Sequence, residues 1–162
     1  MRWQKVLNLP LSLERHSVVL WRLYNMNLVE VTGGKKYQRD IAQKVVYAMI
    51  DTLMPRMRTL DIEVKIRKIS GDAVGYCMQE DTNRMFTIDV QKDLSLRDFI
   101  TTICHEMVHV KQYARNEMDC YGRKWKTKVI SDKVGYYDLP WEKEAYRLQD
   151  KLAQEVWDAD IL

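Results

Sequence analysis

Residues 60–69, LDIEVKIRKI, place apolar and charged residues in near-strict alternation. Successive side chains of a β-strand point to opposite faces, so this pattern predicts a strand with one buried face and one face in water. Turn-forming residues then separate it from two further expected strands, at residues 73–78 and 84–90. The chain is therefore expected to build a small sheet of three strands or slightly more, with one face covered.

Three stretches with helical periodicity flank these strands. The first covers residues 37–53. The second follows Ser95, whose spacing from Asp98 is typical of a capping box and predicts a helix over residues 96–114. The third begins at Pro140, since proline favours the first turn of a helix, and extends to about residue 157. Separate runs of strands and helices predict an α+β fold in which a small mixed sheet packs on helices.

The length of 162 residues fits one domain, which we assign to residues 34–162. Residues 1–33 form an N-terminal extension whose order the pattern does not predict. The extension is expected either to act as a pro-segment over a cleft or to lie partly upstream of a translation start at Met26.

The composition, 46% hydrophobic and 30% charged, is that of a globular protein, and the net charge of +3 does not argue for a nucleic-acid partner. No apolar run approaches the ~18 residues that span a bilayer, and no signal peptide is evident. The three cysteines are an odd number without paired spacing, which fits reduced thiols. We expect a cytoplasmic monomer without a membrane partner.

Two histidines lie one turn apart in the second helix, within His105-Glu106-Met107-Val108-His109. At positions i and i+4 their rings share one face and can reach a single Zn²⁺ at about 2.0–2.1 Å. Glu106 is then placed to take a proton from a zinc-activated water. An apolar stripe marks the opposite, buried side of this helix; it comprises Leu96, Ile100, Ile103, Met107, Val110 and Ala114.

A catalytic zinc takes a third protein ligand and keeps its fourth position for water. No histidine follows His109, so we expect a carboxylate or, less often, a cysteine. The third helix begins Pro-Trp-Glu-Lys-Glu-Ala-Tyr and offers two candidates, Glu142 and Glu144.

The motif H-E-x-x-H, followed some thirty residues later by a helix with E-x-E-A, resembles the gluzincin clan of zinc peptidases. The closest likeness is to the minimal soluble members and to small phage-type proteins with a P-W-E-x-E-A motif. This resemblance covers about residues 94–150. It implies a zincin-like fold, a zinc cofactor and metalloendopeptidase activity on a peptide or protein substrate.

The same resemblance favours Glu142 as the third ligand. In related gluzincins the ligand glutamate is followed four residues later by an aspartate that orients a ligand histidine, often just after an alanine. This frame places Ala145 at +3 from Glu142 and Tyr146 where the aspartate would stand. Glu144 remains the alternative.

The resemblance also implies a hydrogen-bond donor for the oxyanion of the tetrahedral intermediate and an upper sheet edge that binds substrate backbone. Tyr136 and Tyr137 precede the glutamate helix, and we favour Tyr137, although packing explains either tyrosine equally well. The strand at residues 84–90 or its neighbour is expected to form the edge.

Two other functions stay open. The first is a zincin-like module that binds metal without catalysis. The second is a DNA-associated protease, because the segment around Tyr121-Gly122 and Trp125-Lys126 resembles SprT-like proteases. Tyr121 stands where their third histidine would be, and we do not assign it as a ligand. Cys77 is similarly placed to the cysteine ligand of peptide deformylases, but a buried small hydrophobe is the favoured interpretation.

Overall fold

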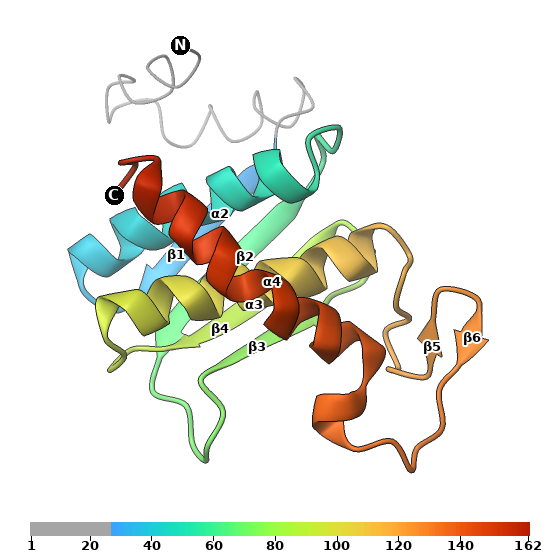
Figure 1. Cartoon of the computed structure of the whole chain (residues 1–162). Helices are drawn as coiled ribbons and strands as arrows, with labels where there is room; N and C mark the ends of the chain where they lie inside the picture. The colour runs from blue at the N-terminus through green and yellow to red at the C-terminus, as the bar shows by residue number, and fades with distance from the viewer. Residues whose placement is uncertain (1–26) are drawn as a thin grey trace.

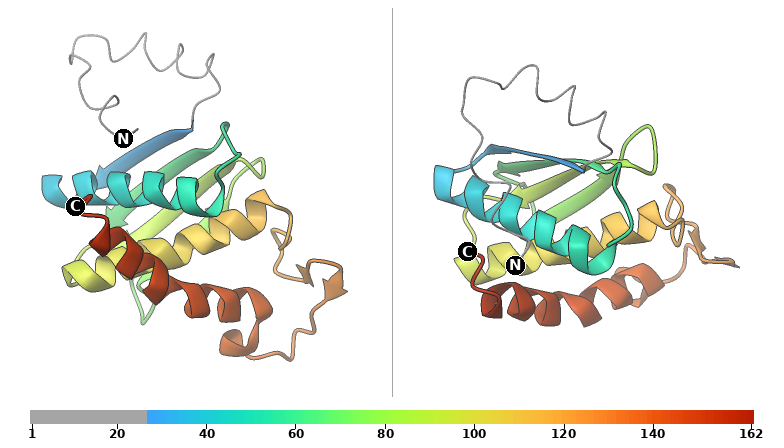
Figure 2. Two further views of the ribbon diagram at one scale, coloured as in Figure 1. Left: turned by 45° about the horizontal axis from the view of Figure 1, so that its top comes forward. Right: turned by 90° about the horizontal axis from the view of Figure 1, so that it is seen from above.

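The computed structural model describes residues 27–162, and this part of the chain forms three layers (Figures 1 and 2). A four-stranded sheet forms the first layer. Helices α2 (Lys36–Leu53) and α3 (Leu96–Ala114) cover one face of the sheet as the second layer. Helix α4 (Pro140–Asp158) forms the third layer and packs across α3. The predicted α+β class with a small mixed sheet is confirmed.

The sheet is mixed, and its strands occur in the order β1-β2-β4-β3. Strands β1 (Leu28–Gly33), β2 (Asp61–Arg67) and β4 (Met85–Gln91) are parallel. Strand β3 (Gly75–Gln79) pairs antiparallel with β4 and, among the strands of the described residues, forms an edge of the sheet. The expected strands at 60–69, 73–78 and 84–90 are thus confirmed, with small shifts at their ends.

Alternation in β2 places its apolar side chains on the face that the helices cover. Ile62 and Val64 are fully buried, and they lie opposite Phe86 and Ile88 of β4 in the parallel register. The charged residues of β2 point to the other face. This inner face of the sheet forms one core with the buried sides of α2 and α3.

The three predicted helices are confirmed. The Oγ atom of Ser95 accepts a hydrogen bond from the backbone N–H of Asp98 at 3.1 Å, as a serine N-cap does. Pro140 occupies the first turn of α4. A short 3₁₀ helix, η2 (Tyr136–Asp138), leads into α4, and a small hairpin of β5 (Lys124–Trp125) and β6 (Lys128–Val129) stands apart from the main sheet.

Strand β1 was not predicted, and it lies before the boundary that the sequence suggested at residue 34. It pairs with β2 from Leu28 opposite Asp61 to Gly33 opposite Ile66, so the sheet includes part of the expected N-terminal extension. Gly33 permits this close pairing, because a Cβ atom there would come within 2.2 Å of the Ile66 carbonyl oxygen. Residues 1–26, with the expected pro-segment or upstream stretch, lie outside the described residues.

Helix α3 is buried on nearly all sides, because the sheet lies on one side of it and α4 on the other. Its apolar residues Ile100, Ile103 and Met107 are at most 1% exposed in the core. The opposite side, which carries the two histidines, therefore faces α4. None of the helices in residues 27–162 is both long and apolar enough to cross a bilayer.

Candidate metal centre

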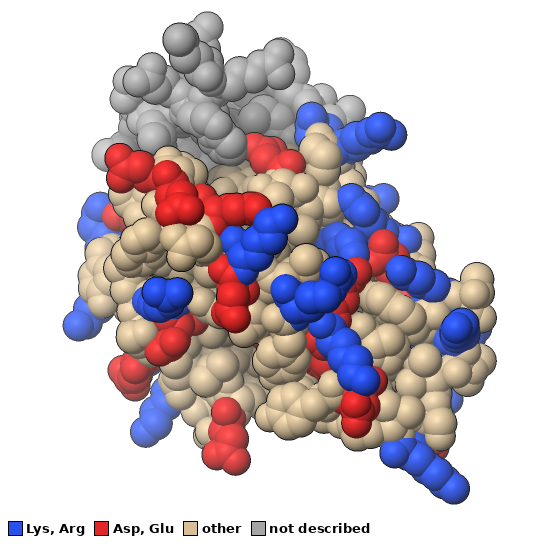
Figure 3. All heavy atoms as spheres, viewed as in Figure 1, with Lys and Arg blue, Asp and Glu red and all other residues tan. Residues whose placement is uncertain are grey.

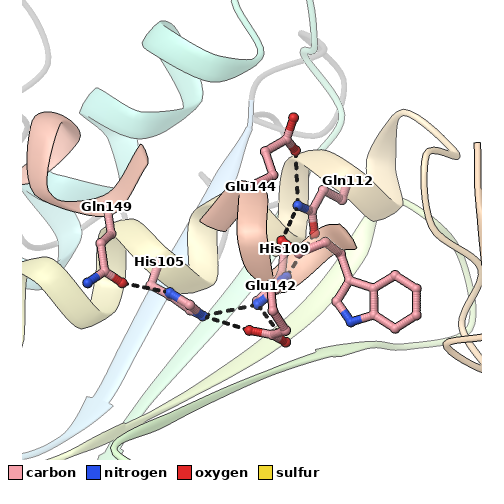
Figure 4. Close-up of polar contacts among 7 residues, drawn as sticks. His105, His109, Gln112, Glu142, Glu144 and Gln149 are labelled. Atoms are coloured by element: carbon pink, nitrogen blue, oxygen red, sulfur yellow. Dashed lines mark hydrogen bonds and ion pairs between the residues drawn. The ribbon is translucent and has the colours of Figure 1, made fainter. Parts of the chain in front are cut away.

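His105 and His109 of α3 converge with Glu142 of α4 (Figure 4). The two histidine Nε2 atoms are 3.2 Å apart. Nε2 of His105 lies 3.4 Å from Oε2 of Glu142, and Nε2 of His109 lies 3.5 Å from Oε1 of the same carboxylate. The three residues are 5–8% exposed, so little water competes for their polar atoms.

These separations fit three ligands of one metal ion. For metal–ligand bonds of about 2.0–2.1 Å and a tetrahedral angle, two ligand atoms lie about 3.3 Å apart. Oε2 of Glu142 is buried and has no hydrogen-bond partner among residues 27–162, although such atoms are normally satisfied. A cation held by His105, His109 and Glu142 would satisfy it.

The carboxylate of Glu142 is held in its charged form. Burial acts to raise its pKa, but the adjacent imidazoles of His105 and His109 outweigh burial and lower the pKa to about 2. For His109, burial acts to lower the pKa, and the nearby carboxylates of Glu142 and Glu106 raise it overall. The pocket thus stabilises positive charge between the imidazoles and the carboxylate, which is what a metal cation supplies.

Two glutamines contact the histidines on their Nδ1 sides, and sequence reasoning missed both. Oε1 of Gln112 lies 2.8 Å from Nδ1 of His109, and Oε1 of Gln149 lies 2.8 Å from Nδ1 of His105 (Figure 4). Their spacing was the available signal. Gln112 follows His109 by three residues and so shares a helix face with it, and Gln149 follows Glu142 by seven and so shares a face with Glu142.

Glu144 does not join the metal cluster. Its Oε2 lies 2.8 Å from Nζ of Lys111 and accepts a hydrogen bond from Nε2 of Gln112 at 3.0 Å. Lys111 is buried and also contacts Glu117, with 2.7 Å between Nζ and Oε2. Of the two candidate third ligands, the structure brings Glu142 to the histidines and Glu144 to a lysine.

Glu106 lies beside the cluster, on the side of α3 that faces strand β3. It is 5% exposed, and burial raises its pKa to about 7 against the opposing effect of the two histidines. Gly75 of β3 approaches it closely: a Cβ atom on Gly75 would come within 2.6 Å of Oε1 of Glu106. The edge strand therefore reaches the acid residue because it carries a glycine at this position.

A cleft of about 780 Å³ opens over these residues. Residues 72–77, including the start of β3, line one side of the cleft, and η2 with the first turns of α4 lines the other. The two histidines, Glu106 and Glu142 lie between these sides. A ligand in this cleft would contact the metal-binding cluster and the edge strand together.

Three tyrosines stand at the cleft beside Glu142. Burial and the adjacent charge of Glu142 raise the pKa of Tyr136, so its phenol keeps its proton at neutral pH. The ring of Tyr146 packs edge-on against His105, with 4.8 Å between centroids. Tyr137, which sequence reasoning favoured as an oxyanion donor, is 73% exposed, and its ring contacts Tyr136 and Tyr146.

The other residues weighed in the sequence lie outside the cluster. Cys77 lines the cleft, where burial raises the pKa of its thiol well above the usual value, but it is not one of the three converging residues. Tyr121 is 79% exposed. On the face shown in Figure 3, basic and acidic side chains are interspersed and form no continuous field of one sign.

Comparisons with known proteins identify no relative. No protein-family model, no curated protein and no solved structure matches this chain. The features that bear on function are therefore the cluster of His105, His109 and Glu142 and the cleft above it.

Proposed function

We propose that this protein is a zinc-dependent peptidase with a zincin-like fold. The observation that carries the proposal is the convergence of His105, His109 and Glu142 at separations of 3.2–3.5 Å, with the buried carboxylate of Glu106 beside them. Two imidazoles and one carboxylate form a ligand set typical of catalytic zinc, because three protein ligands leave one position for water.

When bound, a zinc ion would polarise the scissile carbonyl and lower the pKa of a coordinated water to about 7. His105, His109 and Glu142 would hold the ion. Glu106 would accept the proton of the attacking water and later deliver it to the leaving amine. Its position between the histidines in sequence and its buried carboxylate beside them suit a group that accepts a proton from a water at the metal.

The free edge of β3 supports a peptide as the substrate. Among residues 27–162, strand β3 pairs with β4 only, so within this part of the chain its other edge has unpaired backbone N–H and C=O groups next to the cleft. An extended peptide can pair with such an edge through its own backbone. The close approach of Gly75 to Glu106 would place that peptide next to the proton acceptor.

Tyr136 is the better candidate for the oxyanion donor. A donor must be protonated and must face the reacting carbonyl. The phenol of Tyr136 lies close to the carboxylate of Glu142 in the cluster, and Tyr136 is 54% exposed whereas Tyr137 is 73% exposed. We therefore assign the role to Tyr136 within this proposal, in place of the Tyr137 that the sequence favoured.

The test measures zinc content and cleavage of an unfolded, fluorescently labelled protein such as casein. We expect wild-type protein to carry one zinc per chain and to lose turnover with a chelator and regain it with added zinc. Glu106→Gln should keep its zinc and lose at least about 10²-fold in rate. The matched control is Glu155→Gln, an exposed glutamate on α4, which should match wild type.

Zinc binding without turnover would instead favour a non-catalytic metal-binding module. Wild-type protein that binds no zinc after chelator-free purification would contradict the proposal. Cleavage by Glu106→Gln at the wild-type rate would remove Glu106 from the mechanism.

A further inference from the structure

Both candidate ligand histidines contact an amide oxygen on the side away from the metal position, where metal sites commonly use a carboxylate, a backbone carbonyl or water. We propose that Gln112 and Gln149 are positioning residues that hold Nε2 of each histidine free for the metal while adding no negative charge. This inference rests on the proposed metal centre and concerns how its ligands are oriented.

The orientation of the Gln112 amide follows from its other partners. Gln112 is fully buried, and its Nε2 donates to the carbonyl oxygen of Trp141 and to Oε2 of Glu144, each at 3.0 Å. A flipped amide would place its oxygen against these two acceptors. Oε1 therefore faces His109, and because an amide oxygen can only accept, Nδ1 of His109 must carry the proton. The lone pair of Nε2 then points toward Glu142.

Lys111 and Glu144 hold Gln112 in this orientation. Glu144 accepts hydrogen bonds from both Nζ of Lys111 and Nε2 of Gln112. The ammonium of Lys111 fixes the carboxylate, the carboxylate fixes the amide, and the amide fixes the histidine. A continuous chain of polar contacts thus connects a buried lysine to a candidate metal ligand.

Gln149 contacts His105 from the other helix, with its Oε1 2.8 Å from Nδ1 of His105. It lies two turns after Glu142 on α4, so one helix supplies both a ligand and the group that orients another ligand. The ring of Tyr146 packs edge-on against His105. The ring of His105 is therefore held by Gln149 and Tyr146 together.

Neutral partners change the charge of the centre. Two neutral imidazoles and the single carboxylate of Glu142 would leave a divalent ion with a net charge of +1, whereas a carboxylate in place of either glutamine would reduce it. The centre should therefore bind zinc less tightly than one with a carboxylate partner, because a carboxylate makes the imidazole a more basic ligand. Gln149→Glu is expected to strengthen zinc binding.

The experiment measures the Kd for zinc by competition with a chromophoric chelator, together with the tautomer of each histidine by ¹H–¹⁵N NMR. We expect Gln149→Leu to raise the Kd by about tenfold and to weaken the Nδ1–H signal of His105. Gln149→Glu, which keeps the acceptor oxygen, should bind zinc at least as tightly as wild type. Gln154→Leu, at an exposed position on the same helix, is the matched control and should leave both readouts unchanged.

A Kd for Gln149→Leu within twofold of wild type, with the Nδ1–H of His105 retained, would overturn the inference. So would a loss in Gln149→Leu that Gln149→Glu does not restore, because packing alone would then explain the effect. If wild type binds no zinc, the inference and the proposed function both fail. If the affinities follow the expected order and no peptide is cleaved, the positioning role stands and only the peptidase proposal fails.

Discussion

Oε2 of Glu144 lies 2.8 Å from Nζ of Lys111, on a different side of α4 from the carboxylate that faces the histidines. Residues two apart on a helix are rotated by about 200°, so Glu142 and Glu144 cannot both face the same partner. Lys111 is only 8% exposed, and a buried ammonium without partners is costly. Glu144 therefore serves as a charged partner of the buried Lys111 ammonium and not as a partner of the histidines.

This division between the two glutamates gives the first prediction. Glu142→Gln should raise the Kd for zinc by at least about 100-fold, because it removes a charged ligand. Glu144→Gln should keep zinc within about tenfold of wild type and lower the free energy of unfolding by about 1–3 kcal/mol, because it weakens a buried charged contact. Elemental analysis and thermal unfolding measure the two effects. The opposite pattern would make Glu144 the ligand.

Gly75 provides a second prediction, on the contact between β3 and Glu106. A Cβ atom at this position would come within 2.6 Å of Oε1 of Glu106 and 2.7 Å of Cγ2 of Thr102. Gly75→Ala should therefore displace the edge strand, lower the free energy of unfolding by about 1–3 kcal/mol and reduce turnover while zinc is retained.

The control for this change is Gly135→Ala. A Cβ atom on Gly135 would meet only Oδ2 of Asp138, at an ordinary contact distance of 3.9 Å. Stability and turnover should stay near wild type. If Gly75→Ala and Gly135→Ala had the same stability and turnover, β3 could move away from Glu106 without a loss of stability or activity.

Asp119 gives a prediction for pH dependence in the segment before the hairpin. Its Oδ1 accepts hydrogen bonds from the backbone N–H groups of Arg123 and Lys124, at 2.7 and 2.9 Å. Desolvation acts to raise the pKa of Asp119, but these bonds outweigh it and lower the pKa. A carboxyl whose folded pKa is lowered stabilises the fold above its unfolded pKa of about 3.9, and this stabilisation is lost as pH falls through the folded value.

The amide chemical shifts of Arg123 and Lys124 should therefore titrate together, with a midpoint below about pH 3.9. Asp119→Ala should abolish this titration, and both amides should exchange with solvent faster at neutral pH. A midpoint above the unfolded value would mean that the carboxylate is not held by these bonds.

The three cysteines should differ in reactivity. Cys120 is exposed, whereas Cys104 is fully buried. Burial chiefly, and the negative charge of Glu155 to a smaller extent, raise the pKa of Cys104 to about 12. Burial likewise raises the pKa of Cys77. Because the thiolate is the reactive form, a thiol reagent at pH 8 should modify one thiol per native chain quickly and all three after unfolding. Cys120→Ser should remove the fast reaction; a fast phase that persists would point to opening of the cleft at Cys77.

Local patterns predicted most of the fold. Alternation identified β2, and the Ser95 cap with the apolar stripe placed α3 correctly, because these signals depend on residues close in sequence. Strand β1 was missed because its six residues carry only a short alternation, and its partner β2 begins 28 residues after β1 ends. The sheet order could not be predicted either, since the β3 edge forms only when β2 and β4 pair as parallel strands.

In the candidate site too, local sequence predicts some residues, and others depend on tertiary contacts. The spacing of His105 and His109 places both on one face of a helix, and any helix at this position would do so. The choice between Glu142 and Glu144 depends on how α4 rotates against α3, which is set by tertiary contacts such as the fully buried Ala145. Gln149 contacts His105 across 44 residues of sequence; its spacing from Glu142 predicts the helix face on which it lies, but not the residue that it contacts on α3.

The division of the cluster between α3 and α4 also has a consequence for biosynthesis. A chain that has left the ribosome only as far as α3 carries both histidines and Glu106, but it lacks Glu142 and Gln149. Such a nascent chain would offer a metal ion only two of the three proposed ligands and would lack the proposed positioning residue of His105. If the protein cleaves peptides, this order of synthesis keeps the unfinished chain from attacking itself or the unfolded chains that emerge beside it.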